Sequence, residues 1–525
     1  MGKSCLPMNQ PRADNESKRR LWTTAASVLN DSPIEFNFVL LKTGSVMRPI
    51  ERPIIGNMSR RDVLRVGSVS LSGGLLPALG IRESAAEGST QQLDHPGKAK
   101  SVIFLWMGGG VTHIDSLDPK PEAPEEIRGT LGAIDTALPG VQFSETCPNL
   151  ARIANDLAVV RSFSHDSNDH LLSQVYTLSG RKVTRAQLFT EPNIGSFISH
   201  QYGTRNGLPG YIAIPGITRP GPPPHNLFVG GWLGAQYAPF SVGGQPEQPD
   251  FTVGEKEANP PADHDEDLKP QVLAMPDGIS VTRVDRRAGL REQLETAAHE
   301  AEAAGTFATM EGHYSNALRL LTSSGIRSAF DITQEPDAMR DNYGRTKIGG
   351  RCLLARRLVE AGSRFVMVDY GYDPDYGNLW DNHNAPSQNF PHISETCKRG
   401  YHVAGIDRAF AGLITDLKDR GLLDSTLVVF LTEFGRTPKI NSNGGRDHWG
   451  ACGSVFFTGA GTQTGQIIGA SDAHAAYPTT RHYGPADLAA SIYAAIGIDP
   501  DSRVRDIQNR PVPILDHGNC IEGLL

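Results

Sequence analysis

Acidic, basic and imidazole side chains lie close together in one stretch, TEFGRTPKINSNGGRDHWG, at residues 432–450. This stretch contains Glu433, Arg436, Asp447 and His448. Carboxylates and imidazoles are common ligands of zinc, manganese and iron, and a guanidinium suits the binding of an oxyanion. The stretch therefore predicts one wall of a metal or anion site.

A second pair of ligand-type residues, Asp381 and His383, lies in LWDNHN. Residues two apart on extended backbone point their side chains to the same side, although an isolated pair of this kind also suits a solvated loop. The pair follows a predicted strand, and Glu433 ends the next one. Because ligands gather at the carboxyl ends of parallel strands, Asp381, His383 and His448 predict a site for a divalent metal, with Glu433 and Asp447 as further ligands.

Two more positions leave alternatives open. His170, in SHDSNDHLLSQVYTLSGR, either opens a helix, with Asp169 favouring its N-terminus, or points into a cleft as a ligand or acid/base group. Asp115, in IDSLDPK, either binds the metal or forms part of a turn.

The elements that must position these residues follow an α/β pattern. Continuous apolar runs predict buried strands, and amphipathic periodicity predicts helices between them. The alternation predicts a mostly parallel sheet covered on both faces, interrupted by a proline-rich, polar insertion at about 205–325. The predicted strands are 102–107, 156–163, 363–371, 425–435 and 453–459, and the predicted helices are 345–361, 402–420 and 485–497.

Composition excludes some classes of function. The 525 residues include 50 Lys+Arg and 58 Asp+Glu, so there is no basic surplus with which to neutralise nucleic acid phosphates. The six cysteines form no CxxC pair, which disfavours a thiolate zinc site and leaves scattered buried thiols or one or two disulfides. No G-x-S-x-G is present, which disfavours a serine hydrolase of that type.

The N-terminal region predicts export. Arg60 and Arg61 precede a mildly apolar run at 66–81, which is too short and too rich in Gly and Ser for a stable membrane span. The order of charge, apolar run and small residues resembles a twin-arginine signal over 58–95. We therefore expect a bacterial periplasmic or extracellular protein, handled by the twin-arginine export machinery. Residues 1–57 precede this signal and are interpreted as a mis-assigned or disordered extension.

Several motifs in combination resemble the bacterial family known as domain of unknown function 1501 (DUF1501). The resemblance covers roughly residues 98–500 and implies membership by fold of the alkaline phosphatase and sulfatase superfamily. It implies an alkaline phosphatase-like three-layer α/β/α fold over 98–525, with a mostly parallel central sheet and a loop-rich insertion. The motifs are WMGGGVTHIDSLDPKP, RSFSHDSNDHLLSQVYTLSG, ARRLVEAGSRFV, WDNH, LTEFGRTP and GRDHW.

The same resemblance implies a set of roles. His170 stands where the superfamily has its nucleophile, and Gly108 or Gly109 stands where it has a strand-end Asp, with Asp115 nearby. One metal site therefore looks preserved, while the hydroxyl nucleophile is lost. The implied function is hydrolysis of sulfate or phosphate esters, such as an anionic ester or a sulfated glycan, by metal-bound water. His170 would then be the general acid or base, and Arg436 would hold the ester. The alternative is a non-catalytic exported binding or scaffold protein that keeps the fold and at most one metal.

Overall fold

The strand SVIFLWM, β1 (Ser101–Met107), lies at the centre of the fold and is buried along its whole length. Val102, Phe104 and Trp106 enter one hydrophobic core, whereas the residues between them enter another. A strand that is apolar on both sides must be covered on both faces. The computed structural model describes residues 97–216, 227–243, 323–373, 376–384, 388 and 390–525.

The central sheet has eight strands in the order β14-β4-β13-β10-β1-β7-β5-β6. All neighbouring pairs are parallel except those of β13, which runs antiparallel to both β10 and β4. The carboxyl ends of β1, β7 and β10 therefore meet at one edge. The strands besides β1 are β4 (Ala158–Phe163), β5 (Tyr211–Ile214), β6 (Phe240–Ser241), β7 (Phe365–Asp369), β10 (Thr426–Thr432), β13 (Gly453–Thr458) and β14 (Gln466–Ile468).

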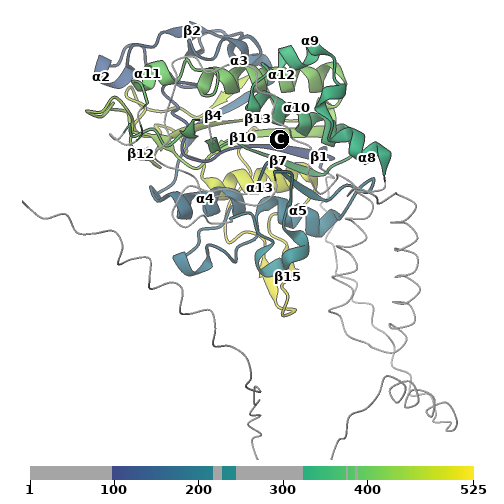
Figure 1. The fold of residues 1–525 in the computed structure, drawn as a ribbon. Helices are drawn as coiled ribbons and strands as arrows, with labels where there is room; N and C mark the ends of the chain where they lie inside the picture. Colours follow the sequence, from purple (N-terminus) through teal and green to yellow (C-terminus); the bar gives the residue numbers. More distant parts are fainter. Residues whose placement is uncertain (1–96, 217–226, 244–322, 374–375, 385–387, 389) are drawn as a thin grey trace, which may run out of the picture. The chain divides into compact units, whose positions relative to one another are not determined.

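Helices cover the two faces of this sheet (Figure 1). One face carries α3 (Pro148–Arg152), α10 (Lys347–Ala361) and α12 (Val403–Asp419), whose buried residues share a core with Ile103 and Leu105. The other face carries α4 (His170–Ser179), α5 (Ile194–Tyr202) and α13 (Pro485–Ile496), which pack with Phe104 and Trp106. The result is a three-layer α/β/α arrangement.

Local sequence explains where the main helices begin and end. The Thr346 side chain caps α10 by accepting from Gly349 N, and Gly362 ends the helix in the left-handed region. Asp169 caps α4 in the same way, by accepting from Leu172 N. The Asp169 cap fixes the first turn of α4, and with it the position of His170.

Shorter elements complete the described fold. Four two-stranded ribbons pair β2 with β3, β8 with β9, β11 with β12 and β15 with β16. Their bounds are β2 (Ala133–Asp135), β3 (Gln142–Ser144), β8 (Tyr372–Asp373), β9 (Gly377–Asn378), β11 (Gly435–Arg436), β12 (His448–Trp449), β15 (Arg503–Arg505) and β16 (Pro511–Pro513). The short helices are α2 (Glu125–Arg128), α8 (Ser324–Ala329), α9 (Asp337–Asn342) and α11 (Ile393–Thr396), with 3-10 turns η1 (Ala154–Asp156), η2 (Arg185–Gln187), η3 (Gly231–Leu233), η4 (Ala235–Tyr237), η6 (Ile332–Gln334) and η7 (Leu423–Ser425).

The predicted fold class, an α/β protein with a mostly parallel central sheet, is confirmed. All five predicted strands and all three predicted helices are present, with β13 as the antiparallel member. Within the range 205–325, however, β5 and β6 belong to the central sheet, because β5 pairs with β7. The predicted signal at 58–95 and the extension at 1–57 lie outside the described residues, as do 217–226 and 244–322 of the predicted insertion.

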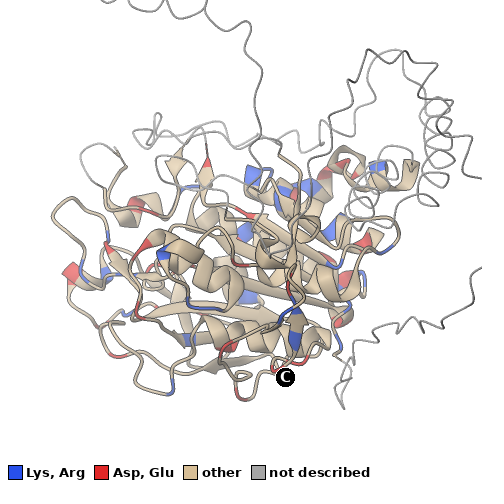
Figure 2. Cartoon of the chain, turned by 90° about the horizontal axis from the view of Figure 1, so that it is seen from below, with Lys and Arg blue, Asp and Glu red and all other residues tan. Residues whose placement is uncertain are grey.

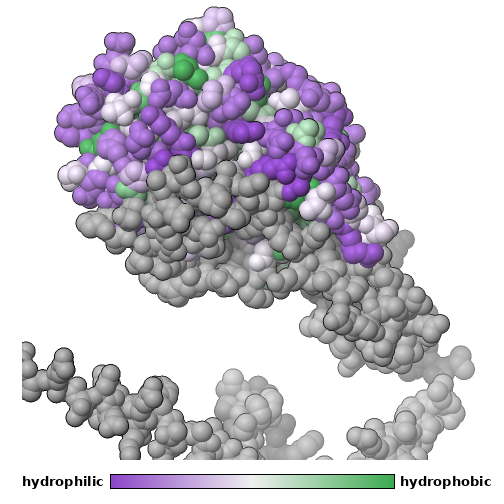
Figure 3. All heavy atoms as spheres, turned by 45° about the horizontal axis from the view of Figure 1, so that its top comes forward, coloured by the Kyte–Doolittle hydropathy of each residue, from purple (hydrophilic) through white to green (hydrophobic). Residues whose placement is uncertain are grey.

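Charges of both signs are interspersed over the described fold (Figure 2). The described residues on the face drawn in Figure 3 are mostly hydrophilic, with small apolar areas between polar ones. No helix in the described part of the chain is both long enough and apolar enough to cross a membrane. The five cysteines that the structure describes are free thiols, and only Cys520 is exposed.

Candidate metal centre

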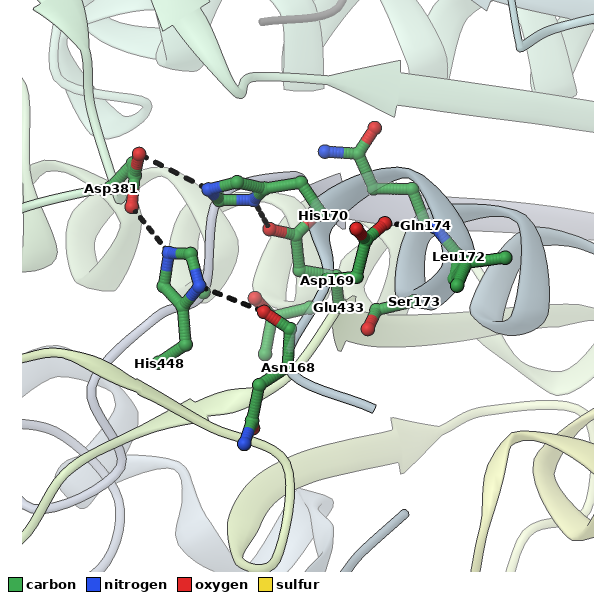
Figure 4. Close-up of polar contacts among 12 residues, drawn as sticks. Asn168, Asp169, His170, Leu172, Ser173, Gln174, Asp381, Glu433 and His448 are labelled. Atoms are coloured by element: carbon green, nitrogen blue, oxygen red, sulfur yellow. Dashed lines mark hydrogen bonds and ion pairs between the residues drawn. The ribbon is translucent and has the colours of Figure 1, made fainter. Parts of the chain in front are cut away.

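His170 enters the site from the first turn of α4. Asp169 precedes it as the N-cap, with its Oδ1 3.0 Å from Leu172 N. Because His170 is the first residue of α4, its imidazole projects beyond the end of the helix rather than into the core. It reaches the carboxyl edge of the sheet, where it lies between Asp381 and Glu433 (Figure 4).

Asp381 and His383 are held by the loop that follows β9. Trp380, 2% exposed, anchors this loop by donating its indole N–H to Tyr370 O and by packing against His402. Asp381 O accepts from Gln388 Nε2 at 2.6 Å. Trp380 therefore anchors the chain directly before Asp381.

The loop after β10 supplies the remaining groups. Glu433 follows the last residue of β10 directly, and its side chain is fully buried. The chain then turns into β11, which pairs with β12 so that Arg436 lies opposite His448. This register brings both side chains to the same side of the ribbon, beside Asp381.

Three imidazoles converge on the carboxylate of Asp381. His448 Nε2 lies 2.9 Å from Oδ1, His383 Nε2 lies 3.1 Å from Oδ1, and His170 Nε2 lies 3.1 Å from Oδ2. The Nε2 atoms of His383 and His448 are 2.8 Å apart. His170, Asp381 and His448 offer ligand atoms that all lie within 4.8 Å of one another. Donor atoms around a tetrahedral zinc ion, at about 2.0–2.1 Å from it, have similar separations.

The other nitrogen of each ring is anchored by an acceptor. His448 Nδ1 donates to the backbone O of Asn168 at 2.9 Å, and His383 Nδ1 donates to Asp447 Oδ1 at 2.7 Å. His170 Nδ1 donates to Glu433 Oε1. Metal-binding histidines characteristically donate this second N–H to a carboxylate or carbonyl, which directs the unprotonated nitrogen at the ion.

This geometry fits a bound divalent cation. The His170 Nε2 atom is buried and makes an ion-pair contact with Asp381 without forming a hydrogen bond. One carboxylate and up to three imidazole nitrogens suit zinc, manganese or iron. The sequence-predicted residues Asp381, His383 and His448 are therefore brought together. The set whose ligand atoms all lie within 4.8 Å of one another, however, is His170, Asp381 and His448.

The sequence predicts Glu433 and Asp447 to be metal ligands, but in the structure their carboxylates contact the imidazoles. The Oε1 atom of Glu433 is engaged by His170 Nδ1, and Asp447 Oδ1 by His383 Nδ1. Both carboxylates therefore orient imidazoles in this structure, instead of pointing at the space between the Nε2 atoms. Asp447 is 53% exposed and marks the outer rim of the cluster.

Arg436 supports Asp381 from behind. Its guanidinium is 2% exposed, and Nη2 lies 2.9 Å from Asp381 Oδ1. Nε donates to Gly110 O at 2.9 Å, Nη1 to Arg446 O at 3.1 Å, and Nη2 also to Gly109 O. These contacts occupy each guanidinium nitrogen, so the predicted role of clamping an ester does not match the observed geometry.

Asp115 lies outside the cluster. Its two carboxylate oxygens accept from Arg446 Nε at 2.7 Å and Nη2 at 2.9 Å, and both side chains are fully buried. Thr112 Oγ1 also donates to Asp115 Oδ2 at 2.7 Å. Of the two interpretations left open by the sequence, the structure places Asp115 in the turn after β1, as the partner of an arginine.

Burial and neighbouring charges shift the pKa values of the three imidazoles in different directions. Burial opposes protonation of His170, but the charges of Glu433 and Asp381 outweigh it and raise its pKa to about 10. The bond to Asp381 also raises the pKa of His383, whereas burial lowers that of His448. Burial opposes ionisation of Asp381, yet its contacts with the three imidazoles hold its pKa well below the ordinary value. A metal ion would have to displace a proton from His170.

Two residues of the site, Asn168 and Gln174, are not predicted from the sequence. Asn168 fixes His448 with its carbonyl oxygen, and its side-chain Oδ1 accepts from Gly450 N at 2.6 Å. Gln174, one turn after His170, is fully buried without a hydrogen bond to its amide group in the described part of the chain (Figure 4). A backbone carbonyl is independent of residue type, so no sequence signal marks the first contact.

Comparisons with solved structures bring up proteins of one kind of fold. Lipoteichoic acid synthase LtaP from Listeria monocytogenes is 9% identical, with a TM-score of 0.31, over 82% of this chain and 76% of that one. Phosphonate monoester hydrolase SpPMH from Silicibacter pomeroyi is 12% identical, with a TM-score of 0.34, over 77% and 74%. The PsFucS1 sulfatase from Pseudoalteromonas sp. is 12% identical, with a TM-score of 0.33, over 77% and 68%.

The sequence itself gives a clearer assignment. No curated protein matches the chain. The family described as "Protein of unknown function (DUF1501)" matches residues 99–525, which include every residue of the cluster around Asp381. The chain belongs to the DUF1501 family.

Proposed function

We propose that the protein is an exported, metal-dependent hydrolase of sulfate or phosphate esters. One observation carries the proposal: three imidazoles with anchored Nδ1 atoms direct their Nε2 atoms at the carboxylate of Asp381. A divalent cation held there would act as a Lewis acid on an anionic ester and lower the pKa of water at the site.

The surrounding residues would then have distinct tasks. Asp381, His448, His383 and His170 would hold the cation. Glu433 would keep the His170 ring in the orientation that presents Nε2. In this proposal His170 is a ligand rather than the general acid or base.

Arg436 would fix Asp381 and offset part of its charge. The substrates consistent with this centre are anionic esters, including those of sulfated glycans.

A non-catalytic binding or scaffold protein remains the second candidate, and a specific observation favours it. Asp381 Oδ1 already faces Arg436, His383 and His448, so the polar network is closed within the protein. The position expected of a hydroxyl nucleophile carries an imidazole. Such a network would stabilise the edge of the sheet without any cation.

Export by the twin-arginine machinery to the periplasm or beyond is part of the proposal and rests on the sequence at 58–95. Cell fractionation of a producing bacterium tests it. Replacing Arg60 and Arg61 by lysine should retain the protein inside the cell. Export of the double variant at the wild-type level would contradict this part of the proposal.

Metal content and ester hydrolysis together decide between the two candidate functions. Elemental mass spectrometry of the purified protein should show close to one equivalent of zinc, manganese or iron. His448→Ala and Asp381→Ala should lose it, and His517→Ala, at an exposed residue, should keep it. A panel of sulfate and phosphate esters then tests hydrolysis. Absence of metal after reconstitution would overturn the hydrolase and leave the binding protein.

A further inference from the structure

We infer that the centre selects singly charged tetrahedral esters over doubly charged ones. The inference rests on the proposed function and names the substrate class more narrowly. Sulfate monoesters and phosphate diesters share this chemistry, because each carries one negative charge at a tetrahedral centre. Phosphate monoesters carry up to two, since their second pKa is about 6.

Three carboxylates surround the converging imidazoles. Asp381 is at the centre, Glu433 lies behind His170 with no exposure, and Asp447 lies at the rim. Glu433 Oε2 is buried and has no hydrogen-bond partner among the described residues. Its negative charge is therefore only partly offset and contributes to the potential that a ligand meets.

The nearby cations are already used by the protein. Arg436 directs its guanidinium at Gly109 O, Gly110 O and Asp381, and is 2% exposed. Arg446 is fully buried, bound through two nitrogens to Asp115. Neither guanidinium offers a free face to an ester. Asp115 balances the charge of Arg446, so only Arg436 adds positive charge beside the imidazoles.

The start of α4 is also occupied. Asp169 accepts from Leu172 N through its side chain and from Ser173 N through its carbonyl. Its Oδ2 pairs with Arg185 at 2.6 Å, and Lys182 pairs with Asp166. The helix terminus that would otherwise attract an anion is therefore neutralised by a fixed carboxylate.

The charges can be summed for the state in which a cation is bound. Ligation requires neutral imidazoles, which leaves three carboxylates against the one guanidinium of Arg436. A single divalent cation brings this group to neutrality. A second negative charge on the ester would then meet only carboxylates, in a partly buried site where like charges repel strongly.

Binding measurements test the selectivity without relying on turnover. Metal-loaded protein is titrated by calorimetry at pH 8 with phenyl sulfate, methyl phenyl phosphate and phenyl phosphate. We expect the first two to bind at least about tenfold more tightly than the third, since one extra like charge costs on the order of a factor of ten. The difference in affinity between phenyl sulfate and methyl phenyl phosphate shows which of the two ester classes the centre prefers. Equal or tighter binding of phenyl phosphate, or no binding by any of the three, overturns the inference.

A charge variant tests the cause. Asp447→Asn keeps an oxygen for His383 Nδ1 but removes a negative charge from the rim. The preference for phenyl sulfate over phenyl phosphate should shrink by about fivefold. Asp501→Asn is the matched control, because Asp501 is exposed and lies away from the cluster. It follows α13, and the end of α13 lies at the opposite edge of the sheet, where Ala495 O accepts from Ala99 N. An unchanged preference in Asp447→Asn contradicts the inference.

The metal measurement separates this inference from the proposed function. Bound metal with a preference for phenyl phosphate means that the centre exists and the selectivity is wrong. Failure to bind metal at all removes the proposed function, and the selectivity with it.

Discussion

The histidines of the cluster divide two tasks between their two ring nitrogens. In each ring, Nδ1 is bound to a fixed acceptor, while Nε2 faces Asp381. The acceptors differ in strength, since Glu433 is a buried carboxylate, Asp447 is a half-exposed one and Asn168 offers a neutral carbonyl. Glu433 should therefore have the largest effect of the three on its imidazole.

Glu433→Gln tests this role at the scale of one residue. The variant keeps an oxygen for His170 Nδ1 but loses the charge that makes the ring a stronger ligand. Metal affinity should fall by about 10–100-fold, as is usual for groups that orient a ligand. Competition with a chelator of known affinity measures the change.

Glu522→Gln, at an 81% exposed position, is the matched control and should retain wild-type affinity. Wild-type affinity in Glu433→Gln as well would show that His170 does not depend on Glu433.

At the scale of elements, the glycine turn after β1 receives Arg436. Gly109 and Gly110 turn their carbonyl oxygens to the guanidinium. Gly110 has a φ of +92°, and a Cβ there would lie 2.7 Å from the Phe434 ring and 2.9 Å from Arg436 Nε. The turn thus needs glycine both for its backbone conformation and for the space it leaves.

Gly110→Ala should therefore lower the free energy of unfolding by about 2–4 kcal/mol, from backbone strain and overpacking together. Gly140→Ala is the matched control, because its φ of +75° is similarly strained but a Cβ there meets nothing within 4 Å. It should cost only about 1–2 kcal/mol. Urea unfolding measures both variants.

Gly110→Ala should also weaken metal binding, because it displaces the guanidinium that holds Asp381. Equal losses of stability in the two alanine variants would show that Arg436 is not packed against this turn.

At the scale of the whole molecule, buried histidines make the fold sensitive to acid. Burial lowers the pKa of His113, His165 and His402, and that of His402 falls to about 3 from an ordinary value of 6.5. These rings stay neutral in the fold but take up protons in the unfolded chain below about pH 6.5. Stability is therefore lost as the pH falls through that value.

Three groups act in the opposite direction: burial raises the pKa of Glu191 to about 7, and neighbouring carboxylates raise the pKa of His170 to about 10 and that of His383. The share of His402 is therefore isolated with a variant.

Between pH 7.5 and 5.5, His402 alone should remove about 1.4 kcal/mol from the free energy of unfolding, one pKa unit's worth of proton uptake by the unfolded chain. In His402→Gln the loss over this range should be smaller than in the wild type by that amount. His517→Gln, at an exposed site, should leave the wild-type loss unchanged. Urea unfolding at the two pH values gives the comparison. A loss in His402→Gln equal to that of the wild type would show that His402 has the same pKa in the folded and the unfolded chain.

Much of the fold could be predicted because its signals are local. The run at 102–107 is apolar at every position, which requires cover on both faces wherever the strand lies in the sheet. The caps at Thr346, Asp169 and Gly362 act within a few residues of the helix they delimit. The antiparallel direction of β13 has no such local signal, because a continuous apolar run gives the same pattern whichever way the strand runs in the sheet.

The sequence by itself determined which residue types the carboxyl edge of the sheet would collect, since Asp381, Glu433 and the GGG turn each follow a strand of recognisable pattern. Only the tertiary structure decided their tasks. A carboxylate can bind a metal, an imidazole or an arginine with the same atoms, and the choice depends on which group lies within about 3 Å. Asp115 meets Arg446, 331 residues away in the chain, and Glu433 meets His170 across 263 residues. Contacts over such separations are set by the packing of the whole sheet, which no local pattern records.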